Sequence, residues 1–183
     1  KTAETISKDS GKIGDYSQQE KKRIYRAIGL GALKYFILKV DPKKNMTFDP
    51  EESVDFNGNT GPFIQYSYAR INSLLDKAGN RGINVPKRIE ESAELNEKEI
   101  QLINLIHQFP YEIFEAAEQG NPSIIANFVY ELAREFNQFY HDYSVLRADN
   151  MSSVQLRLML SSQVSRVLSE SMWLLGIDLP ERM

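Results

Sequence analysis

The amino-acid sequence predicts an all-α protein, a helical bundle of about five helices preceded by a tail of helix and loop. Apolar residues recur every three to four positions in the longer segments, as they do along the buried face of a helix. No segment shows the apolar and polar alternation of a half-buried strand. Hydrophobic residues make up 42% of the chain and charged residues 26%, which is typical of a packed globular domain.

The first helix is expected over residues 18–39. Its apolar stripe consists of Ile24, Ala27, Ile28, Gly31, Ala32, Tyr35 and Phe36. Gly29 and Gly31 lower the helix propensity, so we expect both to mark close packing against another backbone. Residues 40–62 contain Pro42, Pro50, Pro62 and two X-Gly turn dipeptides, and these features predict mostly extended chain or loop.

A second long helix is expected from Pro62 to Gly79, because proline suits the first turn of a helix and glycine its end. The apolar stripe of this helix consists of Phe63, Ile64, Tyr66, Ser67, Ile71, Leu74 and Leu75. Residues 79–95 combine turn formers with charges of both signs and show little periodicity. They are expected to form a long surface connection.

Asn96 and Glu99 have the spacing of a capping box, which predicts a helix start at this point. The expected buried face consists of Ile100, Ile103 and either Ile106 or His107. Because proline removes a helical hydrogen bond, we expect Pro110 to end this helix and a second helix to cover residues 111–118. The sequence Gly-Asn-Pro at 120–122 then stops that helix.

Two further helices complete the expected bundle. Ser123 is expected to cap the first of them, whose stripe is Ile125, Phe128 or Val129, Leu132, Phe136, Phe139 and Tyr140. The second runs from about Ser152 to Leu175 and ends at Gly176. Its stripe is Val154, Leu158, Ser161, Val164, Val167 or Leu168, Ser171 and Leu175.

Composition excludes several classes of function. The chain has no cysteine and only two histidines, so we expect no disulfide, no thiol chemistry and no metal site. A net charge of −3 gives no general attraction to phosphate, so any contact with nucleic acid must come from a local patch or from stacking. No apolar run approaches the roughly 20 residues that span a bilayer, and residues 1–10 lack the apolar stretch of a signal peptide. We expect a cytoplasmic monomer that does not bind membranes.

Catalytic motifs are also missing from the sequence, which has no phosphate loop, no dinucleotide-binding GxGxxG, no HExxH and no GxSxG. Pairs of acids occur at 51–52, 90–91 and 97/99, but they lie in polar segments where we expect exposure and ordinary pKa values. His141 stands beside Asp142 and could be an oriented base, although a lone histidine near a helix end is more often structural or solvated.

Three segments together resemble the arginyl-tRNA synthetases, a family of class I aminoacyl-tRNA synthetases. They are GLGALKYFILK at 29–39, DFNGNTGPFIQYSYARINSLL at 55–75, and LAREFNQFYHDYSVL at 132–146 with the terminal WLLGIDLPERM at 173–183. The second is the most specific, since residues 58–65 match the family's GNTGPYLQ with conservative change. Stripes of leucine and aromatic residues are usually core, and the resemblance depends on all the segments occurring in order.

The resemblance implies two parts in the chain. Residues 1–58 would be the C-terminal tail of the family's catalytic half, and residues 59–183 a helical anticodon-binding domain of the DALR type. The resemblance also implies that aromatic side chains and a C-terminal methionine contact the anticodon stem-loop. The polar loop before the second long helix and an arginine in that helix are further candidates for contact with tRNA. The candidate tRNA-binding residues are Asn59, Phe63, Tyr66, Arg70, Tyr140 and Met183. Aromatic faces suit this role, because unpaired loop bases stack on them.

The resemblance further implies that the chain is a C-terminal piece of an arginine–tRNA ligase, which uses ATP and Mg²⁺ in protein biosynthesis. The family's HIGH and KMSKS signatures are absent, so we expect the piece alone to be inactive and to hold no cofactor. Its expected partners are arginine tRNA and the upstream catalytic domain of the same chain. Two alternatives stay open: a stand-alone helical protein-interaction module without RNA binding, and a folded scaffold that is nearly inert without the catalytic domain.

Overall fold

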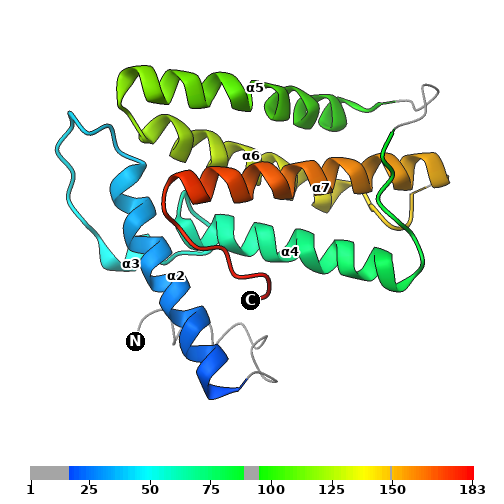
Figure 1. Cartoon of the computed structure of the whole chain (residues 1–183), viewed down its shortest axis with the longest axis horizontal. Helices are drawn as coiled ribbons and strands as arrows, with labels where there is room; N and C mark the ends of the chain where they lie inside the picture. The colour runs from blue at the N-terminus through cyan, green and yellow to red at the C-terminus, as the bar shows by residue number, and fades with distance from the viewer. Residues whose placement is uncertain (1–16, 89–94, 149) are drawn as a thin grey trace.

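A computed structural model describes residues 17–88, 95–148 and 150–183 of the chain (Figure 1). These residues contain helices only, which confirms the all-α prediction. The helices are α2 (Gln18–Leu38), α3 (Pro50–Ser53), α4 (Gly61–Asn80), α5 (Glu97–Gln119), α6 (Ser123–Asp142) and α7 (Met151–Leu174). The N-terminal part of the expected tail and the acid pair at 90–91 lie outside the described residues.

Helices α4 to α7 lie along one another to form the bundle, and α2 crosses its end near the start of α4 (Figure 1). Helix α7 packs against α4, α5 and α6, so its buried positions close the core. The largest fully buried side chains include Phe136, Phe139, Leu132, Leu158, Leu168 and Met172. Each such side chain contributes on the order of 1.5–3 kcal/mol through burial. None of the described helices is long and apolar enough to cross a membrane.

Helix α2 is joined to the bundle through a close approach of two glycines. A Cβ atom placed on Gly61 would lie only 2.6 Å from the carbonyl oxygen of Gly31. A Cβ atom on Gly31 would lie 2.6 Å from the side-chain nitrogen of Gln65. Close packing is therefore confirmed at Gly31. The same expectation is wrong for Gly29, which points roughly 200° away around α2, because a Cβ atom added there would meet no other element within 4 Å among the described residues.

The helix ends follow the sequence signals in most places. Asn96 and Glu99 form the expected capping box at the start of α5. Gly120 and Gly176 adopt left-handed conformations, with φ of 57° and 67°, directly after α5 and near the end of α7. Ser123 does not cap α6, because it lies inside the first turn. The Oδ1 atom of Asn121 instead accepts hydrogen bonds from the Ser123 backbone N–H at 3.1 Å and from its hydroxyl at 2.7 Å.

The segment 40–62 is mostly extended chain and loop, as expected, but it contains the one-turn helix α3. This helix begins because Asp49 accepts hydrogen bonds from two backbone N–H groups and Pro50 fits the first position. One expected helix end is wrong. Helix α5 continues through Pro110 instead of ending there. Proline inside a helix costs about 3 kcal/mol. Burial of Phe109 and Ala116 in the core on either side of it offsets this cost.

Helix α5 buries a different face from the expected one. The buried positions are Glu99, Leu102, Leu105, Phe109 and Ala116. Ile100 is 44% exposed and His107 lies in solvent, while Ile103 and Ile106 are only half-buried. Apolar residues occur on both sides of this helix, so periodicity alone could not show which side meets the bundle. The choice follows from the positions of α6 and α7.

Candidate nucleic-acid interface

One face of α4 carries a row of four polar or aromatic side chains. Tyr66, Arg70, Ser73 and Lys77 are separated by three or four residues, so they share one side of the helix. Burial of Ile64 and Ile71 holds the opposite side of α4 against α7 and α6. The row is therefore fixed to a rigid element and turned outward.

The row on α4 borders a cavity of about 320 Å³, which we call the α4 pocket. Its lining consists of Tyr66, Ala69, Arg70, Ser73, Leu74 and Lys77 from α4, Tyr140 from α6, and Met183. The lining contains two cationic side chains and no acidic side chain, although the chain as a whole is acidic. The pocket thus provides the local positive charge that the net charge does not.

The guanidinium group of Arg70 lies against both tyrosine rings of the pocket. Its central carbon is 4.8 Å from the centre of the Tyr66 ring and 5.6 Å from the centre of the Tyr140 ring. Each ring is supported from another side, Tyr66 by Phe56 at 6.3 Å and Tyr140 by Phe136 at 6.0 Å. These supports hold both rings in place before any ligand arrives.

Met183 reaches the α4 pocket because the residues after α7 are held across α2 and α4. The side-chain amide of Gln65 donates to the Asp178 carbonyl oxygen at 2.8 Å and to the Ala27 carbonyl oxygen at 3.0 Å. Arg182 then pairs with Asp76 of α4 at 3.1 Å. The buried Gln65 joins α2, α4 and the last residues of the chain, which brings Met183 to the same pocket as Tyr66.

Two of the six candidate residues lie away from the α4 pocket. The Oδ1 atom of Asn59 accepts a hydrogen bond from the Tyr35 hydroxyl at 2.6 Å, and its carbonyl oxygen accepts one from Lys39 at 3.0 Å. Phe63 packs against Tyr130, with 5.4 Å between the ring centres. The structure thus brings together Tyr66, Arg70, Tyr140 and Met183. It places Asn59 and Phe63 in contacts within the protein.

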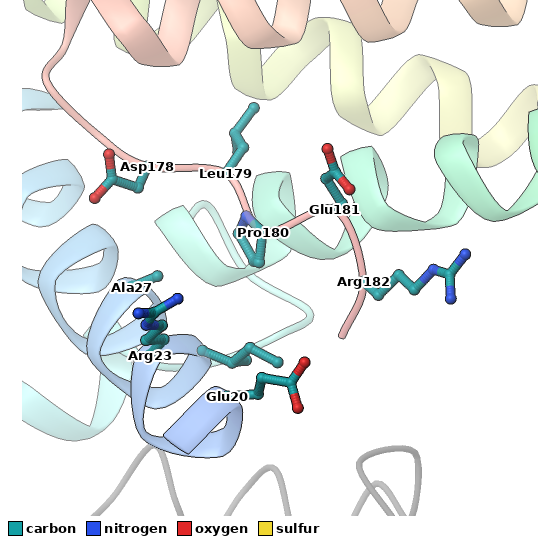
Figure 2. A pocket seen from close by; sticks show the side chains of 9 residues that line it. Glu20, Arg23, Ala27, Asp178, Leu179, Pro180, Glu181 and Arg182 are labelled. Carbon is teal, nitrogen blue, oxygen red and sulfur yellow. The ribbon is translucent and has the colours of Figure 1, made fainter. Parts of the chain in front are cut away.

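A larger hollow of about 520 Å³ lies between α2 and the last residues of the chain (Figure 2). Figure 2 shows Glu20, Arg23 and Ala27 on the α2 side and residues 178–182 on the other. Its charged residues carry both signs, and none of the six candidate residues lines it. This hollow therefore lacks the combination of aromatic faces and positive charge that makes the α4 pocket a candidate for RNA.

The other candidate groups do not form a reactive site. His141 is almost fully exposed, and its Nδ1 atom contacts only the neighbouring Asp142 at 2.9 Å. The expectation that Glu99 is exposed is wrong, because it is 2% exposed and pairs with Arg157 at 2.8 Å. Within residues 17–88, 95–148 and 150–183, no cluster of side chains could hold a metal ion.

Comparison with known families assigns this arrangement of helices. The sequence pattern of the DALR anticodon binding domain matches residues 64–183, which include α4 from its fourth residue on, α5 to α7 and all the residues that line the α4 pocket. The chain belongs to the DALR anticodon-binding domain family. The start of the match at residue 64 leaves α2 and α3 outside the family's core, and the expected boundary after residue 58 stays a prediction.

This DALR domain is similar to part of several arginine–tRNA ligases. It is 53% identical over 182 residues to the enzymes of Bacteroides thetaiotaomicron and Phocaeicola vulgatus, and each match covers 100% of this chain and 30% of the relative. Its structure is similar to that of Thermus thermophilus arginyl-tRNA synthetase, with a TM-score of 0.86 and 30% identity. That match covers 99% of this chain and 30% of the Thermus chain. The DALR domain chain thus spans about 30% of the length of these relatives.

Two polar residues that line the α4 pocket of this DALR domain, and one that contacts Arg70 beside it, were not among the candidates from the sequence. Ser73 and Lys77 continue the spacing that begins at Tyr66 and Arg70, so the helical period could have indicated them. Asn137 on α6 accepts a hydrogen bond from Arg70. No sequence signal pointed to it, since it lies 67 residues from Arg70 and meets it only through packing of α4 against α6.

Proposed function

We propose that this DALR domain binds the anticodon stem-loop of arginine tRNA and holds an unstacked loop nucleotide at the α4 pocket. The observation that carries the proposal is the meeting of Tyr66, Arg70, Tyr140 and Met183 around one cavity of about 320 Å³. Family membership supports it independently, because the matching family is described as anticodon-binding. Asn59 and Phe63 then act indirectly, by supporting α4.

Stacking supplies most of the binding free energy in this proposal. Single-stranded bases stack on tyrosine rings and on arginine guanidinium planes, and each stack contributes about 1–3 kcal/mol. The α4 pocket presents both kinds of surface within a few ångströms, since the Arg70 guanidinium lies beside the two tyrosine rings. Met183 provides a flexible apolar side chain at the pocket that adapts to the shape of the base.

Charge supplies the attraction to the RNA backbone. Neither Arg70 nor Lys77 forms an ion pair within the described part of the chain, so both cations are available to phosphates. Arginine meets phosphate with two parallel hydrogen bonds, whereas lysine acts as a point charge. Binding should therefore weaken as salt concentration rises, with a slope set by the few phosphates that these residues contact.

We further propose that the longer protein is a cytoplasmic arginine–tRNA ligase that uses ATP and Mg²⁺ in protein biosynthesis. The similarity to enzymes of which this chain spans about 30% supports this proposal. The exposed side of α2 would pack against the upstream catalytic domain. Leu30, Leu33 and Ile37 on that side are 41%, 40% and 50% exposed, and they form an apolar stripe that suits an interface between domains.

Titration of arginine tRNA against the chain and against a Tyr66→Ala, Tyr140→Ala double variant tests the stacking role. We expect the double variant to bind at least about tenfold more weakly at low salt, because two stacking surfaces are lost. A Tyr111→Ala, Phe114→Ala double variant is the matched control. These aromatic residues are both 67% exposed on α5 and lie outside the α4 pocket, so their loss should leave binding unchanged.

Three outcomes of the titration distinguish tRNA binding by stacking from the two alternative functions. Weaker binding by the Tyr66 and Tyr140 variant alone supports the proposal. Equal binding by the chain and that variant would refute the stacking assignment. An absence of salt-dependent tRNA binding in the unmodified chain would favour a protein-interaction module or an inert scaffold.

A further inference from the structure

Arg70 is held in a fixed position without being neutralised. Its guanidinium contacts the rings of Tyr66 and Tyr140, and its Nη1 atom donates a hydrogen bond to the side-chain oxygen of Asn137. No carboxylate pairs with it among the described residues. A neutral amide orients the cation and leaves its charge intact, whereas the carboxylate of a salt bridge would cancel much of that charge.

The orientation of the Asn137 amide is determined by its other partners. Its Nδ2 atom donates to the Ser67 hydroxyl oxygen at 2.6 Å and to the Ala133 carbonyl oxygen at 2.9 Å. The Ser67 hydroxyl donates in turn to the Phe63 carbonyl oxygen at 2.8 Å. A flipped amide would place its NH₂ group against Arg70 and its oxygen against the Ala133 carbonyl oxygen. The Oδ1 atom therefore faces Arg70.

We propose that Asn137 is a positioning residue that orients Arg70 across the two tyrosine rings and preserves its full positive charge for an RNA phosphate. The inference rests on the proposed function and deepens it, because it states how the free protein prepares the cation of the α4 pocket. Ser67, which is fully buried, anchors Asn137 from α4. The chain from Ser67 through Asn137 to Arg70 thus runs from α4 to α6 and back to α4.

Two substitutions at Asn137 separate orientation from charge. Asn137→Leu keeps a similar shape but removes the acceptor, so Arg70 keeps its charge and loses its orientation. Asn137→Asp keeps an acceptor for Arg70 but adds a negative charge, so Arg70 keeps its orientation and is partly neutralised. A residue that only supported the fold would not give opposite effects on these two properties.

The expected results follow from what each variant removes. For Asn137→Leu we expect tRNA affinity to fall by about two- to tenfold, the cost of ordering one long side chain on binding, with an unchanged slope of log affinity against log salt. For Asn137→Asp we expect weaker binding at low salt and a slope smaller in magnitude by about 0.7, because one phosphate contact is lost. Urea unfolding followed by circular dichroism checks that both variants are folded.

A double variant tests whether Asn137 acts through Arg70. In an Arg70→Met background, Asn137→Leu should cause no further loss of affinity, because the side chain that it orients is gone. The Cδ protons of Arg70 give a second measurement that needs no tRNA. Their NMR shifts, displaced by the two tyrosine rings in the unmodified chain, should move toward ordinary values in Asn137→Leu and stay displaced in Asn137→Asp.

The outcomes distinguish this inference from the proposed function. Affinities of Asn137→Leu equal to those of the unmodified chain, an additive loss in the double variant, or unmoved Arg70 shifts would each overturn the positioning role. If the Tyr66→Ala, Tyr140→Ala variant binds as well as the unmodified chain, the proposed function fails instead. In that case the NMR shifts still decide whether Asn137 orients Arg70.

Discussion

Replacing Gly61 by alanine should destabilise the domain through one defined clash. Gly61 begins α4, and an added Cβ atom would lie 2.6 Å from the carbonyl oxygen and 2.8 Å from the carbonyl carbon of Gly31. Both of these atoms belong to the backbone of α2, so they cannot rotate away as a side chain could. The methyl group fits only if α2 and α4 move apart.

The magnitude follows from the cost of overpacking. Extra atoms in a packed interior typically cost 1–3 kcal/mol. Because the contact here is with backbone, we expect about 2–3 kcal/mol. For a chain of this length, 1 kcal/mol corresponds to about 2–4 °C in the unfolding temperature, so Gly61→Ala should lower it by roughly 4–12 °C. Gly29→Ala should have the opposite effect, because no atom lies within 4 Å and alanine favours a helix over glycine by about 0.5–1 kcal/mol.

The assay is urea and thermal unfolding of the unmodified chain, Gly61→Ala and Gly29→Ala, followed by far-ultraviolet circular dichroism, which reports helix content. The two variants carry the same chemical change in the same pair of packed helices, so they differ only in what the new methyl group meets. Equal unfolding midpoints for the two variants would refute the close approach of α2 and α4 at Gly31.

Two further predictions concern buried polar groups. Glu99→Ala should lower the free energy of unfolding by about 3–5 kcal/mol, because it leaves the largely buried Arg157 without its partner at 2.8 Å. Chemical unfolding measures this loss, and an Arg157→Met, Glu99→Leu double variant that is no more stable than Glu99→Ala would contradict the pairing. Burial raises the pKa of the Tyr35 hydroxyl, whose single hydrogen is shared between Asn59 Oδ1 at 2.6 Å and the Ala126 carbonyl oxygen at 2.7 Å. Because this pKa is higher in the folded than in the unfolded state, the contribution of Tyr35 is complete below about pH 10 and declines at higher pH. Unfolding free energies measured at about pH 8 and pH 11 should therefore fall less for Tyr35→Phe than for the unmodified chain, and equal falls would contradict this sign.

Sequence patterns predicted most of the helices because their signals are local. The capping box at Asn96 and the stop at Gly120 depend on residues within one turn, and both are confirmed. The continuation of α5 through Pro110 could not be predicted in the same way. Whether a helix accepts a proline depends on the burial of its neighbours, and this burial comes from helices distant in the sequence.

The candidate site shows the same division. Resemblance to a family supplied Tyr66, Tyr140 and Met183, and helical spacing supplied Arg70. The sequence did not separate these residues from Asn59 and Phe63, which make contacts inside the protein. Whether an aromatic residue in a helical stripe is exposed depends on which other elements pack beside it. The sequence of the stripe alone does not show which elements these are.

The sequence by itself determined the helical class, the ends of most helices and the family, because these follow from local propensity and from short motifs read in order. Only the tertiary structure decided which face of α5 is buried and that Arg70 donates a hydrogen bond to Asn137. The tertiary structure also showed that an acidic chain forms a pocket lined by two cationic side chains and no acidic side chain. These properties arise where α4, α6 and the last residues of the chain meet, and such contacts form only when the core brings distant segments together.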